Sequence, residues 1–324
     1  FATDTISLHD RWHVTMSGRY NRSRIINEDQ ILPGGGAGSL DGNHVFQRFN
    51  PAIGTTYAWT PALTAYLGYN EGNRTPTSIE LGCADPANPC KLPNAMAGDP
   101  PLKQVVTKTW EAGLRGALSK QTQWTAGLFH AQSTDDILFV AAPDVSSFGY
   151  FKNFGKTQRQ GIELGLNSQQ GAFKFATHYT WLQATYQSSE VLGGDSNSTN
   201  TGGNIAIQPG NTIPLTPKHI LKIHADYAWS PVWSTGLGMA AFSGVYARGN
   251  ENNQHQPDGD EHLGSGRTAG YAVFNANARY ASSKNTQWML NVMNLFDRRY
   301  ASAGQLGPAA FSANGQQFVS SSTR

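Results

Sequence analysis

The chain has 324 residues, of which 39% are hydrophobic and only 14% charged, with a formal net charge of +2. This length exceeds that of one sandwich domain and suits part of a single large barrel. The charge is nearly balanced and forms no basic cluster, so nothing indicates a nucleic-acid partner. No apolar run reaches the roughly 18 residues of a transmembrane helix.

Alternation of apolar and polar residues over about ten positions recurs along the chain, with aromatic residues near the ends of many stretches. Because successive side chains of a strand point to opposite faces, each stretch predicts a strand with one apolar and one polar face. In chain order the apolar sets include Trp12, Val14, Met16 and Tyr20; Trp110, Ala112 and Leu114; Ile162, Leu164 and Leu166; Leu221, Ile223 and Tyr227; and Phe274, Ala276 and Tyr280. This pattern is typical of a transmembrane antiparallel β-barrel with a lipid-facing apolar band.

The polar faces of the same strands are expected to line the lumen of such a barrel, because lipid-facing and lumen-facing residues alternate. The charged residues that this alternation places on the lumen side are Arg19, Glu111, Arg115, Glu163, Lys222, Asp226 and Arg279.

The connections between the strands fall into two classes. Short turns are expected at residues 10–11, 61–62, 119–122, 169–171, 230–231 and 283–285. Long segments rich in Gly, Pro, Asn and Asp are expected as extracellular loops near residues 30–44, 72–101, 188–216 and 249–270. Short turns at one rim and long loops at the other are the layout of an outer-membrane barrel.

About 12–13 strands are predicted, in pairs before residue 30 and within 46–69, 104–141, 148–187, 219–247 and 271–300, with a further strand near Gln317. The chain begins inside an apparent strand without an initiator Met, and it ends in a loop-like segment. We therefore expect residues 1–324 to be one barrel domain truncated at both ends.

Two cysteines, Cys83 and Cys90, lie in the Pro-rich loop at 72–101. In an oxidising compartment they would form a disulfide that limits loop entropy. A reduced pair or a metal site are the alternatives, and the lack of a nearby His argues against the metal.

Five segments resemble, in the same order, motifs of TonB-dependent outer-membrane receptors. They are YNEGNRTPT at 69–77, LKQV at 102–105 followed by TWEAGL at 109–114, GIEL at 161–164, IPLTPKH at 213–219 and NVMNLFDRRY at 291–300. Asn73 stands where the family has an aromatic residue. Within these motifs we expect Gly72 and Gly113 to permit a bend or a close backbone approach.

The resemblance implies the later portion of a barrel of about 22 strands, without the plug domain that fills the family's barrels. It implies an active transporter of the bacterial outer membrane that imports a metal chelate, with a ferric siderophore as the first expectation. Copper chelates, cobalamin, haem and oligosaccharides are alternative ligands. Expected partners are the chelate, outer-membrane lipid, and the TonB–ExbB–ExbD energising complex, reached through a plug segment. The seven lumen residues would then bond to plug groups.

Basic residues in or beside the long loops could receive an anionic chelate, and the two histidines of loop 250–262 could join them. The candidate ligand-binding residues are Arg74, Lys91, Arg248, His255, His262 and Arg267. The four carboxylates of loop 250–262 fit a Ca²⁺ turn poorly, so we expect a solvated loop and no resident metal or cofactor. Phe148, Tyr150 and Phe151 are expected in an interfacial aromatic girdle.

No nucleophile has an evident base and orienting partner, so an enzyme is not expected. Two other readings remain open. A barrel of this size without a plug could be a passive, porin-like channel, and alternation also occurs in a soluble β-sandwich or adhesin.

Overall fold

The computed structural model describes residues 1–34, 39–85, 90–91, 102–141, 148–258, 262, 264–308 and 317–319. The long strands are β1 (Ala2–His9), β2 (Trp12–Asn27), β3 (Gly42–Thr60), β4 (Leu63–Arg74), β6 (Val105–Ser119), β7 (Thr122–Ala141), β8 (Phe148–Gln170), β9 (Phe173–Tyr186), β12 (His219–Ala228), β13 (Trp233–Phe242), β14 (Tyr271–Ser283) and β15 (Thr286–Val292). The short elements are α1 (Ser78–Leu81), β5 (Cys90–Lys91), β10 (Glu190–Gly193), β11 (Asn204–Ile207), β16 (Leu306–Pro308) and β17 (Gln317–Val319).

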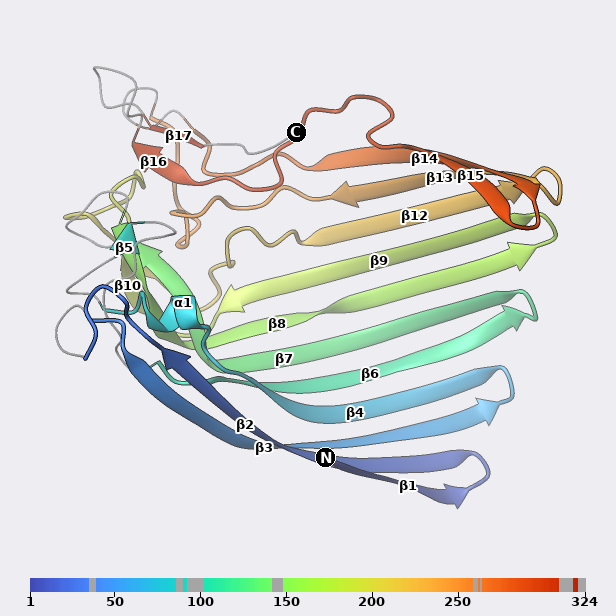
Figure 1. The fold of residues 1–324 in the computed structure, drawn as a ribbon, viewed down its shortest axis with the longest axis horizontal. Coiled ribbons are helices and arrows are strands. Elements are labelled where there is room, and N and C mark those ends of the chain that lie inside the picture. The colour runs from blue at the N-terminus through green and yellow to red at the C-terminus, as the bar shows by residue number, and fades with distance from the viewer. Residues whose placement is uncertain are drawn as a thin grey trace.

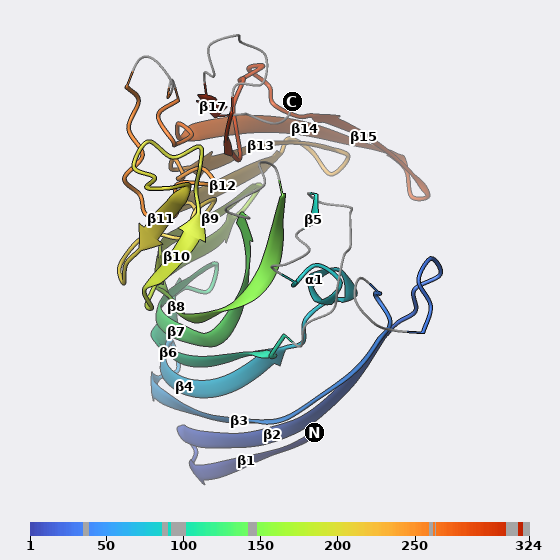
Figure 2. The ribbon, with the colours of Figure 1, turned by 90° about the vertical axis from the view of Figure 1, so that its left-hand side faces the viewer.

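The long strands form one antiparallel sheet in the order β1-β2-β3-β4-β6-β7-β8-β9-β12-β13-β14-β15, so each pairs with its neighbours along the chain. The sheet curves into part of a barrel wall, with β1 and β15 at its two edges (Figures 1 and 2). The predicted all-β, partial-barrel architecture is thus confirmed. In the part of the chain that the structure describes, no helix is long and apolar enough to cross a membrane.

The two classes of connection lie at opposite ends of the wall (Figure 1). The tight connections, such as those between β1 and β2 and between β12 and β13, lie at one end, here called the turn end. The connections that carry α1, β5, β10 and β11 lie at the other, here called the loop end.

The convex face carries the predicted apolar sets. Register pairs Trp12 with Tyr57, Tyr69 with Trp110, and Trp233 with Tyr280, so their side chains share this face from one strand to the next. Large apolar side chains here stay exposed, among them Leu128 at 59% and Trp288 at 65%. An apolar band of this kind suits contact with lipid rather than water.

The loop-end halves of β7 and β8 leave the wall near Asp135, whose φ is 55°. In Figure 2 they pass between β10 on one side and α1 with β5 on the other. One apolar cluster joins them to the β10–β11 hairpin through Val140, Phe154, Leu192 and Ile205, and another joins them to α1 through Leu81 and Ile137.

The aromatic residues of β8 pack in these two clusters, which corrects the expected girdle. Tyr150 packs against the first cluster and Phe151 against the second. The side chain of Phe148 lies outside the described residues. Burial under α1 and the β10–β11 hairpin explains the difference, because a girdle position would require these rings to face lipid.

Candidate functional site

The concave face carries all seven charged residues that parity assigns to a lumen. Register links them across the sheet: Arg19 lies opposite Asn50, Glu111 opposite Phe129, and Lys222 opposite His178. The pairing of neighbouring strands also places Arg115, Glu163, Asp226 and Arg279 on this face. Contact between these residues and a plug stays a prediction.

One motif glycine, Gly113, makes room for a ring on this face. The Tyr66 side chain lies over Gly113 of the neighbouring strand, where an added Cβ would lie 2.5 Å from its hydroxyl oxygen and 2.5 Å from the Ala126 carbonyl oxygen. Gly113 therefore permits a close approach, as expected. A Cβ on Gly72 would meet nothing within 4 Å, so the structure gives no steric reason for that glycine.

A surface of arginine and aromatic residues, here called the arginine–aromatic surface, continues the concave face at the loop end of β13 and β14. Its members are Phe242, Tyr246, Arg248, Arg267 and Tyr271. Phe242 pairs with Tyr271, and their rings lie 5.2 Å apart. Tyr246 pairs with Arg267 in the same register beyond the strand ends. Val245 and Ala247 alternate with this set and are buried, so Tyr246 and Arg248 share the opposite side.

Both arginines of this surface are exposed. The Arg267 guanidinium lies 4.3 Å from the centre of the Tyr246 ring, a cation–π contact. Among the described residues, neither arginine forms a salt bridge. Arg248 lies close enough to Glu251 to favour its charged form, while burial raises the pKa of that carboxyl overall. Two cations beside aromatic faces can receive an anionic, aromatic ligand.

Beside this surface, two loops are joined by a network of buried asparagines and one histidine, here called the Asn–His network. Asn197 is fully buried and donates to the Gly249 carbonyl at 2.8 Å and to Asn252 Oδ1 at 3.2 Å. Asn250 accepts from the His255 backbone N–H at 3.0 Å. The contacts of Asn197 join residues about fifty positions apart and brace the loop that carries Arg248.

His255 is 2% exposed, and both of its ring nitrogens are bonded. Nδ1 accepts from the Ser198 backbone N–H at 3.0 Å, and Nε2 faces the Gly264 carbonyl at 3.0 Å. A backbone N–H can only donate and a carbonyl only accept, so the ring is neutral with its proton on Nε2. Both ring nitrogens are engaged in holding the loops together, and contact between His255 and a ligand stays a prediction.

We expect the Asn–His network to loosen as the pH falls. Burial lowers the pKa of His255 below its ordinary 6.5. At a pH above the ordinary pKa, the ring is neutral in both the folded and the unfolded protein. At a lower pH, the ring of the unfolded protein takes up a proton that the buried ring of the folded protein resists, so the folded state loses stability. Hydrogen exchange of the Ser198 amide, corrected for intrinsic rates, should rise between about pH 7 and about pH 5.

The control for this pH effect is His255→Gln, which removes the titrating ring. Glu251 acts in the opposite sense, because its raised pKa makes the folded state bind a proton more readily as the pH falls. The variant keeps this contribution and should lose the loosening below pH 6.5. An equal rise of exchange in both proteins would contradict the role given to His255.

Two of the remaining candidate residues, Arg74 and His262, are already engaged by other side chains. Arg74 contacts Glu80 at 2.7 Å, and Glu80 completes a capping box with Thr77 at the start of α1. His262 is 8% exposed, and its Nδ1 lies 2.6 Å from Asp258 Oδ2. The side chain of Lys91 lies outside the described residues.

No cluster of three or more His, Cys, Asp or Glu that could hold a metal occurs among the described residues. Two carboxylates of loop 250–262, Asp260 and Glu261, lie outside them. Cys83 is 5% exposed, and its Sγ lies 3.7 Å from the Gly149 carbonyl oxygen, while the backbone of Cys90 pairs with that same glycine. The Cys90 side chain is not described, so the disulfide stays a prediction.

Sequence reasoning missed the aromatic members of the surface, Phe242, Tyr246 and Tyr271. The signal was present in Tyr246 and Arg248, two positions apart on a strand-like segment that leaves β13. Their partner Arg267 lies about twenty residues later across a long loop, and only the continued register brings it opposite Tyr246.

Comparison with known proteins gives a consistent result. A family model described as TonB dependent receptor-like, beta-barrel, matches residues 1–295. The chain is 23% identical over 321 residues to the probable TonB-dependent siderophore receptor PiuA of Acinetobacter baumannii, covering 98% of this chain and 39% of the relative. It is 22% identical over 291 residues to the catecholate siderophore receptor Fiu of Escherichia coli K12, covering 89% and 34%.

Solved structures share the fold. The crystal structure of PiuA superposes with a TM-score of 0.64 at 18% identity, covering 98% of this chain and 40% of PiuA. The copper transporter OprC superposes with a TM-score of 0.66 at 18% identity, covering 98% and 44%. The chain thus spans about two fifths of the length of these proteins.

Proposed function

Because this chain belongs to the TonB-dependent receptor β-barrel family of the bacterial outer membrane, we propose that it forms barrel wall and ligand surface of a receptor that binds a metal chelate outside the cell and imports it. A ferric siderophore is the ligand we place first. The chain spans less than half of its relatives, so this activity is proposed for the whole protein that contains it.

The arginine–aromatic surface carries the proposal. Arg248 and Arg267 are exposed at the loop end, where a ligand arrives from outside the cell. Anionic ferric chelates match two exposed cations, and aromatic chelating groups match the rings of Tyr246 and Tyr271. Relatives named as siderophore receptors, including PiuA, Fiu and the ferrioxamine receptor of Yersinia enterocolitica, favour the same class of ligand.

Transport would also need partners for the concave face. The charged residues there, among them Glu111, Glu163 and Lys222, would bond to a plug domain through charge-assisted hydrogen bonds. A TonB–ExbB–ExbD complex acting on that plug would supply the energy. The convex face would contact outer-membrane lipid. No step of this proposal makes or breaks a covalent bond.

A copper chelate is the second candidate ligand, because the copper transporter OprC is among the solved structures that share this fold. The two ligand classes differ in charge and in ring content, so direct binding separates them. A passive channel would show no saturable ligand binding.

Uptake by the intact receptor tests the proposal. Cells lacking the gene, and the same cells carrying it, are supplied with a radiolabelled ferric catecholate under iron limitation, with and without a proton uncoupler. We expect accumulation that needs both the gene and the energised inner membrane. Accumulation that persists with the uncoupler would support the passive channel instead, and none at all would leave the ferric chelate without support.

A further inference from the structure

Toward the loop end of the apolar band, the charge of the residues on the convex face differs from strand to strand. Two aromatic pairs lie on the convex face, Tyr20 with Phe49 across β2 and β3, and Tyr69 with Trp110 across β4 and β6. Tyr69 lies opposite Ile53, so the second pair is four residues nearer the turn end than the first. Their exposure, 60% for Tyr20 and 53% for Trp110, suits the edge of the lipid band. The first convex position beyond them toward the loop end is polar on each strand, whereas Val45, opposite Arg24, and Ile26 are exposed apolar residues.

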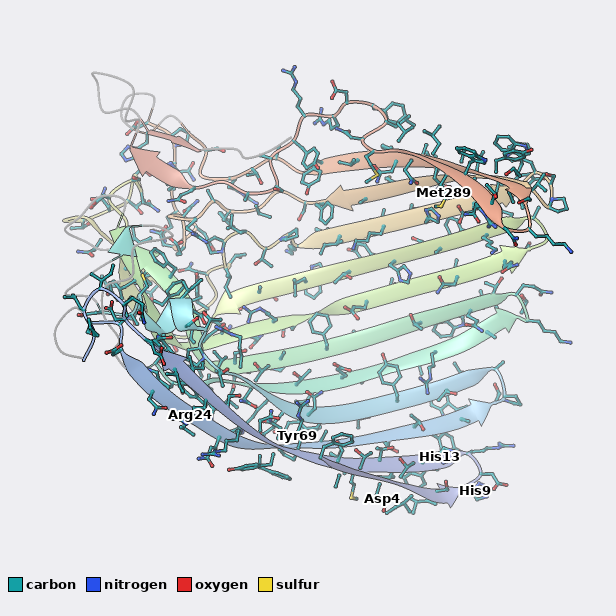
Figure 3. All side chains as sticks on the ribbon, viewed as in Figure 1. Asp4, His9, His13, Arg24, Tyr69 and Met289 are labelled. Atoms are coloured by element: carbon teal, nitrogen blue, oxygen red, sulfur yellow. The ribbon has the colours of Figure 1, made fainter. Side chains whose placement is uncertain are left out.

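Positive charge is concentrated on β2 at this level. Arg22 and Arg24 follow Tyr20 at intervals of two residues, so all three share the convex face, and both arginines are exposed. Figure 3 labels Arg24 at the loop end of β2, far from His9 and His13 at the turn end. Arg24 Nε donates to Asn43 Oδ1 at 2.9 Å, which orients its guanidinium.

Neither of these arginines forms a salt bridge among the described residues. On the neighbouring strands the cations have a carboxylate partner, since Lys108 lies 3.8 Å from Glu71, which also bonds to Arg48 of β3. Farther along the wall the convex positions are largely amides, such as Gln160, which accepts from Gln158 and donates to Gln183. Lys156 is a single exposed cation there.

The position of the two arginines matches a lipid headgroup layer. With about 3.3 Å per residue and a tilt near 45°, Arg22 lies about 5 Å and Arg24 about 9 Å beyond Tyr20 along the membrane normal. The headgroup layer of one leaflet is about 5–8 Å thick. Arg22 thus lies within this layer and Arg24 at its outer margin, where both long side chains reach headgroups, and arginine binds phosphate through paired N–H donors.

We propose that Arg22 and Arg24 form a binding site for the phosphorylated headgroup of an outer-leaflet lipid. The inference rests on the proposed outer-membrane placement, which sets the loop end outward. Arg24, held by Asn43, and Arg22 beside it would together hold one phosphate group or a pair on the same headgroup. The site lies on the opposite face of the wall from the arginine–aromatic surface.

Native mass spectrometry of the full-length receptor in detergent tests this site. The probes are bisphosphorylated lipid A and its dephosphorylated counterpart. Each surface arginine contributes about a fivefold change in affinity for anionic lipid, so Arg22→Gln with Arg24→Gln should weaken binding of the phosphorylated lipid about 25-fold. Binding of the dephosphorylated lipid should not change. Heat-modifiable gel mobility verifies that the variants form the barrel.

Lys156→Gln is the matched control, because it removes one exposed convex cation without a second beside it. An equal loss in this control, or an unchanged affinity in the double variant, would overturn the site. Ferric-chelate binding is measured on the same proteins and should be unaffected. Failure of chelate binding in every protein, with the lipid result intact, would count against the proposed function alone.

Discussion

Replacing Arg248 and Arg267 together with glutamine is expected to weaken binding of an anionic ferric catecholate to the full-length receptor by about two to four orders of magnitude. Hydrogen bonds to charged groups contribute about 1.5–3 kcal/mol each, and about 1.4 kcal/mol corresponds to a factor of ten. Both side chains are exposed without a salt bridge among the described residues. Both side chains lie at the loop end, beyond the strands of the wall, so the barrel itself should be unaffected, and Glu251 loses only the nearby charge of Arg248.

Quenching of tryptophan fluorescence during titration measures this affinity. Lys156→Gln, which removes one exposed cation of the convex face, controls for a general change of charge. Tyr246→Leu removes only the ring beneath Arg267 and should cost about threefold, since an exposed cation–π contact is worth about 0.5–1 kcal/mol. A neutral ferric hydroxamate should respond weakly to all three changes. If the double arginine variant keeps the affinity for the catecholate, the ligand binds elsewhere.

Gly113→Val is expected to destabilise the barrel by about 1–3 kcal/mol, the usual cost of overpacking. The new Cβ would lie 2.5 Å from both the Tyr66 hydroxyl oxygen and the Ala126 carbonyl oxygen, and the second of these belongs to the backbone of β7. Neither the ring nor the neighbouring strand can stay in place. The temperature at which heat-modifiable mobility is lost should therefore fall.

Gly72→Val provides a matched control for this substitution. Gly72 lies on the same concave face one strand away, and its Cβ would meet nothing within 4 Å. We expect stability to stay constant or to rise slightly, because valine favours extended strands. Adding Tyr66→Ala to Gly113→Val should recover part of the loss, by removing one of the two contacts. Equal destabilisation at both glycines would show that a change in backbone entropy, and not the contact with the Tyr66 ring, causes the loss of stability.

Several features of the wall follow from the sequence alone. Strand side chains alternate with a period of two, and a slip of one residue would turn every apolar side chain to the other face. The alternation around Trp110 or Leu221 therefore fixes strand, face and register together. For this reason the alternation alone was enough to place Glu111, Lys222 and Arg279 on one face. Motif order sufficed to indicate the family.

Tertiary structure alone decided the loop end. His255 and Arg248 are both polar residues of one loop, and no local pattern distinguishes the buried ring from the exposed guanidinium. The difference comes from Asn197 and Ser198, about fifty residues earlier, which contact that loop from another connection. Likewise Tyr150 and Phe151 look like girdle residues until α1 and the β10–β11 hairpin cover them. In a strand, the two-residue alternation sets the face of each side chain from the local sequence. In a loop, the burial of a side chain depends on which distant segment packs against it.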